Sequence, residues 1–127
     1  MNVVVDTSVW VDFFRGHDVP ELEDALSDGR VVLAPVVVAE LLSGARRPQD
    51  VVKLRELLDE LPVYSTPREH WVNVGLLRRK LSREGVSVSV PDAHVARCSI
   101  ELGAVLLSRD SVLARIAQSV GLKVTRA

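Results

Sequence analysis

The sequence has a single cysteine, Cys98, one methionine, and aromatic residues that make up only 4% of the chain. One cysteine excludes an internal disulfide and leaves a reducing, cytoplasmic setting as the expectation. No apolar stretch approaches the roughly 20 residues of a membrane-spanning helix, and Val36–Ala39 is typical of the longest ones. Because Asp6 interrupts the first apolar run and no basic segment precedes it, we do not expect a signal peptide or a membrane partner.

Short motifs of several enzyme classes are also absent. The chain lacks a Walker A loop, a GxGxxG loop, a GxSxG motif and the His/Cys spacing of zinc sites. The net charge of −1 gives no overall attraction to nucleic acid. Arginine nevertheless outnumbers lysine, and the basic residues at 78–83 and at Arg46 and Arg47 are either local phosphate contacts or ordinary solvated positions.

What is present indicates one globular domain, because 127 residues with 47% apolar and 26% charged composition suffice for a folded core. Short apolar runs alternate with helical patterns, which predicts an α/β fold over 1–127 with a parallel sheet of four to five strands flanked by helices. The predicted strands are 2–5, 31–34, 104–107 and 123–125, with 86–90 as either a strand or a loop. The predicted helices are 7–14, 20–28, 35–42, 49–61, 67–84, 92–102 and 111–119. Trp71, Val74, Leu77 and Leu81 are expected to face inward.

Four acidic residues stand where a parallel α/β sheet places its functional crevice, outside the carboxyl ends of the strands. Asp6 follows the first predicted strand, and Asp110 follows the strand at 104–107. Glu40 interrupts an aliphatic helix, so it must be exposed at a crevice or paired, and Asp92 opens the helix after 86–90. The sequence therefore predicts that these four carboxylates converge.

Clustered carboxylates repel one another and persist where something cancels their charge. Mg²⁺ and Mn²⁺ prefer such oxygen ligands, and a bound ion could serve hydrolysis at phosphorus. The alternative is that Asp92 and Asp110 only cap helices, since aspartate is common at helix starts. From the residues alone, both interpretations of these two positions stay open.

Four ordered blocks resemble the PIN-domain ribonucleases, specifically the VapC toxins of toxin–antitoxin pairs. The blocks are DTSVWVDFFRG at 6–16, PVVVAELLSG at 35–44, PDAHVA at 91–96 and GAVLLSRD at 103–110. The resemblance spans nearly the whole chain. One position departs from it: many members carry a further Asp two residues after the one that Asp110 matches, and here that residue is Val112.

The resemblance implies a Mg²⁺- or Mn²⁺-dependent endoribonuclease that cuts RNA, transfer or ribosomal RNA being common targets. Asp6, Glu40, Asp92 and Asp110 match the acidic quartet, with Asp6, Asp92 and Asp110 as metal ligands. Thr7 or Ser8, together with Ser108, match supporting hydroxyls. The family also implies a homodimer and a VapB-type antitoxin that blocks the site. With Val112 in place of an acid, the chain is expected to bind one ion tightly.

Individual residues in and near the acidic quartet have expected roles as well. Glu40 is the expected group that orients or deprotonates the attacking water, and Arg109 is the best-placed phosphate contact because it adjoins Asp110. Trp10, Phe13 and Phe14 either pack in the core or stack on RNA bases. The rival functions are a catalytically weak PIN module that binds protein or RNA, and a phosphatase or receiver-like domain. The phosphatase is disfavoured because Ser8 stands where a DxD motif needs an acid. The receiver-like domain is disfavoured because the first strand lacks paired acids after it and the last strand is followed by Arg126 in place of a lysine.

Overall fold

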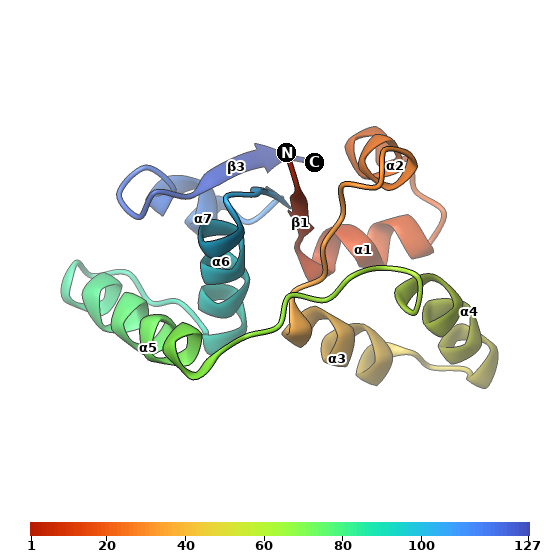
Figure 1. Cartoon of the computed structure of the whole chain (residues 1–127), viewed down its shortest axis with the longest axis horizontal. Coiled ribbons are helices and arrows are strands. Elements are labelled where there is room, and N and C mark those ends of the chain that lie inside the picture. The colour runs from red at the N-terminus through yellow and green to blue at the C-terminus, as the bar shows by residue number, and fades with distance from the viewer.

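The computed structural model describes residues 1–127 as three strands and seven helices. The strands are β1 (Val3–Val5), β2 (Val105–Ser108) and β3 (Lys123–Arg126). The helices are α1 (Thr7–Phe14), α2 (Pro20–Ser27), α3 (Pro35–Gly44), α4 (Pro48–Leu58), α5 (Arg68–Arg83), α6 (Val90–Leu102) and α7 (Ser111–Ile116). In Figure 1, α1–α4 lie on one side of the strands and α5–α7 on the other. The predicted α/β class is confirmed.

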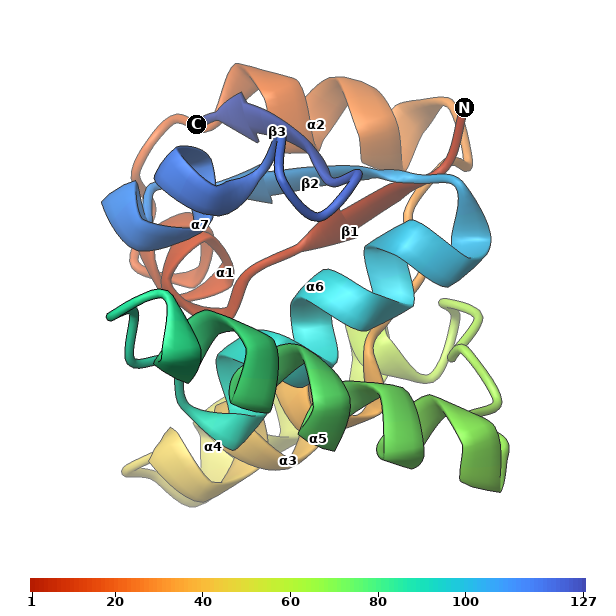
Figure 2. The same cartoon turned by 90° about the vertical axis from the view of Figure 1, so that its left-hand side faces the viewer.

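The strands form one parallel sheet in the order β1-β2-β3. Val4 is paired with Leu106, and Leu106 with Val124, so that the three strands run in register. Their carboxyl ends consequently meet at one edge, where β1 leads into α1 and β2 leads into α7 (Figure 2). This edge is the one to which the sequence assigned the acidic residues.

The sheet has three strands, so the prediction of four to five was wrong. The segment 31–34 runs beside β1, but it makes only isolated bridges, Val31 with Val3 and Leu33 with Val63. Two single pairs do not build a ladder, because Pro35 begins α3 directly after the segment. The apolar character of 31–34 reflects burial against the core rather than a further strand.

The alternating segment 86–90 is a loop that ends in the first residue of α6, so its interpretation as a strand was wrong and the alternative of a loop is confirmed. Val88 is buried, and Val86 packs against the core, without a strand beside them. The side chain of Ser89 accepts a hydrogen bond from the backbone N–H of Asp92 and caps α6. The alternation therefore reflects the inward positions of Val86 and Val88, whereas Val90, the first residue of α6, is exposed.

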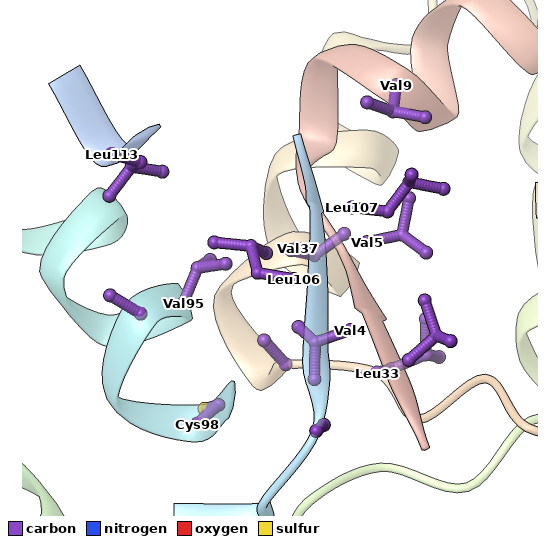
Figure 3. Close-up of a cluster of buried hydrophobic side chains, with 14 of the residues drawn as sticks. Val4, Val5, Val9, Leu33, Val37, Val95, Cys98, Leu106, Leu107 and Leu113 are labelled. Atoms are coloured by element: carbon purple, nitrogen blue, oxygen red, sulfur yellow. The ribbon is translucent and has the colours of Figure 1, made fainter. Parts of the chain in front are cut away.

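The core lies on both faces of β1 and β2. Val4 and Val5 of β1 and Leu106 of β2 are almost fully buried and are enclosed by helices on either side (Figure 3). Val74, Leu77 and Leu81 face inward as predicted, but Trp71 does not, since 45% of it is exposed. None of the helices is both long and apolar enough to cross a membrane.

Candidate active site

Asp6 occupies the junction between β1 and α1 and is the N-cap of that helix. It is 8% exposed. One carboxylate oxygen accepts the backbone N–H of Thr7 at 2.9 Å, and the other accepts the hydroxyl of Ser108 at 3.0 Å. The strand ends of β1 and β2 thus hold this carboxylate in a fixed orientation at the sheet edge.

Asp110 is held at the end of β2 in a similar way. Its backbone N–H donates to the hydroxyl of Ser108 at 3.0 Å, and its Oδ1 accepts the backbone N–H groups of Val112 and Leu113 at 2.8 and 3.4 Å. It is therefore the N-cap of α7. Asp110 does cap a helix, as the capping alternative states, and the same position also brings its carboxylate near Asp6.

Asp92 reaches the same place from α6, in whose first turn it lies. The cap of α6 is Ser89, so the carboxylate of Asp92 is not the capping group, contrary to the capping alternative. Burial raises the pKa of Asp92, and the nearby charges of Asp110 and Glu40 raise it further.

The pKa of Asp6 is also raised, first by burial and then by the charges of Asp92 and Asp110. The hydrogen bonds from Ser108 and Thr7 act in the opposite direction. Carboxylates that raise one another's pKa values share a site, and perturbed acids in a crevice are typical of functional centres. The predicted convergence of the acidic residues is thus visible in their electrostatics.

Glu40 projects from α3 and is exposed. Its Oε1 accepts a 2.7 Å hydrogen bond from the hydroxyl of Thr7, which lies at the start of α1. The prediction that this glutamate is exposed at a crevice or paired therefore holds in both respects. Ser8 is exposed and makes no side-chain hydrogen bond, so of the two neighbouring hydroxyls only Thr7 contacts an acid.

The donors fit a hard divalent cation, because carboxylate and hydroxyl oxygens are the ligands that Mg²⁺ and Mn²⁺ prefer. In this structure, only one set of three potential ligand atoms from histidine, cysteine or acidic side chains lies within 4.8 Å of one another. That set does not include the acidic residues at the sheet edge. The acidic oxygens are thus spread more widely than one closed coordination shell. Mg²⁺ accommodates this spacing because it keeps several of its own waters.

Arg109 lies next to Asp110 but is engaged within the protein. Its guanidinium forms an ion pair with Asp12 of α1, and its Nε donates to the backbone carbonyl of Ala127 at 3.1 Å. Its role as a phosphate contact stays a prediction.

A groove of about 800 Å³ opens beside Glu40. Its apolar lining includes Phe14 and Leu41, and its basic side chains include Arg15, Arg46 and Lys53, none of which forms an ion pair. Trp10 is fully buried, so core packing explains its presence. Phe14 is 36% exposed, so core packing explains only part of its side chain.

The set of three ligand atoms elsewhere consists of His70, His94 and Cys98, all buried between α5 and α6. Burial raises the pKa of the Cys98 thiol to about 12, so in the metal-free protein the thiol stays protonated at neutral pH. The ring nitrogens of the two histidines already have hydrogen-bond partners. Sequence reasoning missed this cluster, because His70 is distant in the chain from His94 and Cys98 and the three residues form no known motif.

Comparison with known proteins agrees with this geometry. The profile of the PIN domain matches residues 3–119. VapC ribonuclease Mb1587 of Mycobacterium bovis and ribonuclease VapC11 of Mycobacterium tuberculosis are each 30% identical over 125 residues, covering 90% of this chain and 92% of theirs.

Solved structures with the same fold include two toxin–antitoxin complexes. VapBC2 from Rickettsia felis, bound to a DNA fragment from its promoter, has a TM-score of 0.82 at 19% identity and covers 100% of this chain and 99% of that one. VapBC-5 from Mycobacterium tuberculosis has a TM-score of 0.72 at 20% identity, with 100% of both chains covered. The matched length, the fold and the identity lead to one assignment: the chain belongs to the PIN-domain family and, within it, to the VapC ribonucleases.

Proposed function

We propose that this protein is a VapC-type endoribonuclease toxin that requires Mg²⁺ or Mn²⁺ and acts as one domain over residues 1–127. The observation that carries the proposal is the meeting of Asp6, Asp92 and Asp110 at the carboxyl edge of the sheet, where burial, and after it the charges of neighbouring carboxylates, raise the pKa values of Asp6 and Asp92. A structural role alone does not account for three partly buried acids facing one another, because their repulsion costs stability.

Asp6, Asp92 and Asp110 are the residues that would hold the cation, directly or through water. A bound divalent ion supplies positive charge that stabilises the phosphate as the RNA strand breaks. Ser108 keeps two of these carboxylates oriented, through its hydrogen bonds to the Asp6 carboxylate and the Asp110 backbone. The chain thus presents its negative charge in a fixed arrangement before any ligand arrives.

Glu40 is the group that orients, and accepts a proton from, the attacking water. It is exposed to solvent, and the hydrogen bond from Thr7 fixes one of its oxygens. The other oxygen makes no hydrogen bond within the protein and is free to accept one from water. Attack by water leaves a 5′-phosphate and a 3′-hydroxyl, so the product ends report on this role.

The substrate is RNA, with transfer or ribosomal RNA as the expected target. The groove beside Glu40 suits a polyanion because Arg15, Arg46 and Lys53 line it without acidic partners. A VapB-type antitoxin is the expected inhibitor and would block the same site. The predicted homodimer rests on family membership, and the cytoplasmic location rests on the single cysteine.

The test is cleavage of total cellular RNA by the purified, antitoxin-free chain in Mg²⁺, in Mn²⁺ and in EDTA, with Asp6→Asn as control. We expect discrete fragments with 5′-phosphates that disappear in EDTA and in the variant. A 2′,3′-cyclic phosphate contradicts the role of water. RNA binding without cleavage by the folded protein in either metal favours the alternative, a catalytically weak binding module, for which the apolar Val112 is the supporting observation.

A further inference from the structure

A buried chain of hydrogen bonds connects three helices away from the acidic cluster. The backbone N–H of Val36 in α3 donates to Nε2 of His94 in α6 at 3.3 Å. Nδ1 of His94 lies 2.6 Å from Nε2 of His70 in α5. Nδ1 of His70 in turn lies 3.0 and 3.1 Å from the two carboxylate oxygens of Glu101 in α6. We call these four residues the histidine chain.

The surroundings of the histidine chain keep it rigid and dry. His70 and His94 are 1% and 0% exposed. The ring of Trp71 stacks on that of His94 with a centroid distance of 4.7 Å and an interplanar angle of 7°. Glu101 is fixed at its outer end by hydrogen bonds that Tyr64 and Arg97 donate. Side chains that packing and several hydrogen bonds hold in place can fix the position of the groups they contact.

Only one arrangement of protons satisfies the histidine chain. A backbone N–H can only donate, so Nε2 of His94 must accept the bond from Val36 and carries no proton. The ring proton of neutral His94 is therefore on Nδ1, where it is donated to Nε2 of His70. His70 then carries its own proton on Nδ1 and donates it to Glu101.

The end of the histidine chain at Val36 replaces a missing helix cap. The N-cap residue of α3, Ala34, has no side chain that can accept a hydrogen bond, and Pro35 has no N–H. Val36 therefore provides the first N–H of α3, and the acceptor comes from another helix. The helix so anchored carries Glu40 one turn later, while His94 lies two residues after Asp92.

The geometry points to a positioning role: His70 and His94 hold α3 against α6 and thereby set the separation of Glu40 from Asp92. This role rests on the proposed function, in which the two acids work together. Glu40 and Asp92 repel each other, and no hydrogen bond or ion pair joins their side chains directly. The bond from Val36 to His94 is a direct polar link between their two helices.

The kinetic test uses variants that differ in this bond. His94→Leu removes the hydrogen bonds to Val36 and His70, together with the contact to the Cys98 sulfur, and His70→Leu leaves His94 without an acceptor. His70→Gln keeps one donor and one acceptor at the same end of α5. The control is Leu81→Ala, also in α5, which removes a fully buried side chain and lowers stability without touching the histidine chain.

All assays are run at a temperature at which circular dichroism shows every variant folded. We expect kcat for RNA cleavage to fall roughly 10–100-fold in His94→Leu and His70→Leu, with KM within about twofold, because a misplaced group affects the reaction step. His70→Gln should recover most of the loss, and Leu81→Ala should keep the wild-type kcat. A wild-type kcat in His94→Leu overturns the inference.

A spectroscopic readout does not depend on activity. Long-range ¹H–¹⁵N spectra of the wild-type histidine rings should show the proton of both His70 and His94 on Nδ1, and a proton on Nε2 of His94 overturns the inference. In His94→Leu the amide resonances of the first turn of α3 should shift, whereas in Leu81→Ala they should not.

These readouts distinguish a failure of the proposed function from a failure of the positioning role. If the wild-type chain cleaves no RNA, the proposed function fails, and the α3 resonances alone decide whether the histidine chain holds that helix. If His94→Leu does not fold, the comparison of His70→Leu with His70→Gln and the wild-type ring spectra decide instead. Equal kcat values for those two His70 variants would reject the positioning role.

Discussion

The hydroxyl of Ser108 donates a 3.0 Å hydrogen bond to Oδ2 of Asp6 across the ends of two neighbouring strands. The hydroxyl oxygen of Ser108 in turn accepts the backbone N–H of Asp110 at 3.0 Å. One hydroxyl therefore fixes two of the acids relative to each other. Burial raises the pKa of Asp6, and the bond from Ser108 is the strongest of the influences that lower it.

This relationship predicts the effect of Ser108→Ala. Without the hydroxyl, burial acts on Asp6 less opposed, so its pKa should rise further and the acidic limb of the pH–activity profile should move to higher pH. A hydrogen bond to a charged group is worth about 1.5–3 kcal/mol, so kcat/KM at neutral pH should fall roughly 10–100-fold. The matched control is Ser65→Ala, an exposed position. An acidic limb that stays in place would count against this account of Ser108.

The hydrogen bond from Thr7 to Glu40 predicts a coupled pair. Thr7→Val keeps the shape of the side chain but removes the donor, and we expect roughly tenfold lower kcat in the wild-type background. In the Glu40→Gln background the same change should have little further effect, because the carboxylate it orients is already gone. Kinetics of the two single variants and the double variant measure the coupling. Losses that multiply independently would show that Thr7 acts elsewhere.

Asp92→Asn should raise the stability of the metal-free protein and lower its activity. The pKa of Asp92 is raised by burial and by its acidic neighbours, so the charged form is disfavoured in the folded state. A carboxyl with a raised pKa costs the folded state stability as the pH rises through that pKa, and the cost disappears below the unfolded value of about 3.9. We therefore expect the metal-free variant to have a higher Tm than the wild type at pH 7, and a similar one below about pH 4.

The same variant should lose RNA cleavage by more than about 100-fold, because a proposed metal ligand is removed. Thermal unfolding in EDTA over a pH series gives the stability comparison. Glu56→Gln, an exposed position on α4, serves as the control and should follow the wild type. A lower Tm for Asp92→Asn at pH 7 would mean that the carboxylate is stabilising, contrary to the electrostatics described above.

Arg46 lines the groove and has no ion-pair partner, so it is available to phosphate. Arg46→Gln should weaken RNA binding and reduce the salt slope of the binding constant by about 1. Binding is measured with Glu40→Gln as the parent protein so that the RNA stays intact. Lys123→Gln, an exposed position at the start of β3 and outside the groove lining, is the control. An unchanged slope for Arg46→Gln would exclude a phosphate contact there.

Features with a local chemical cause could be predicted from the sequence. Pro20 and Pro35 begin helices as expected, and Gly103, with a φ of 61°, ends α6. Asp6 and Asp110 could be assigned to the sheet edge because each directly follows an apolar strand. The local pattern and the parallel topology together place these acids without further information.

Features that depend on distant partners could not be predicted. Val86–Val90 alternates like a strand, but no neighbour pairs with it, and the pattern alone cannot supply one. Trp71 matches the apolar face of α5, yet its ring lies partly exposed and stacks on His94. His70 and His94 meet only because α5 packs against α6, and no spacing in the sequence indicates that contact.

The most direct test of the central claim, that the repelling acids are a cation site, is a calorimetric titration of Mn²⁺ into the metal-free chain. We expect one tight saturable site that Mg²⁺ competes for and that weakens at least about tenfold in Asp6→Asn and in Asp92→Asn, with Glu56→Gln like the wild type. Saturable binding that survives both substitutions, or no binding by the folded wild-type chain, would contradict the account.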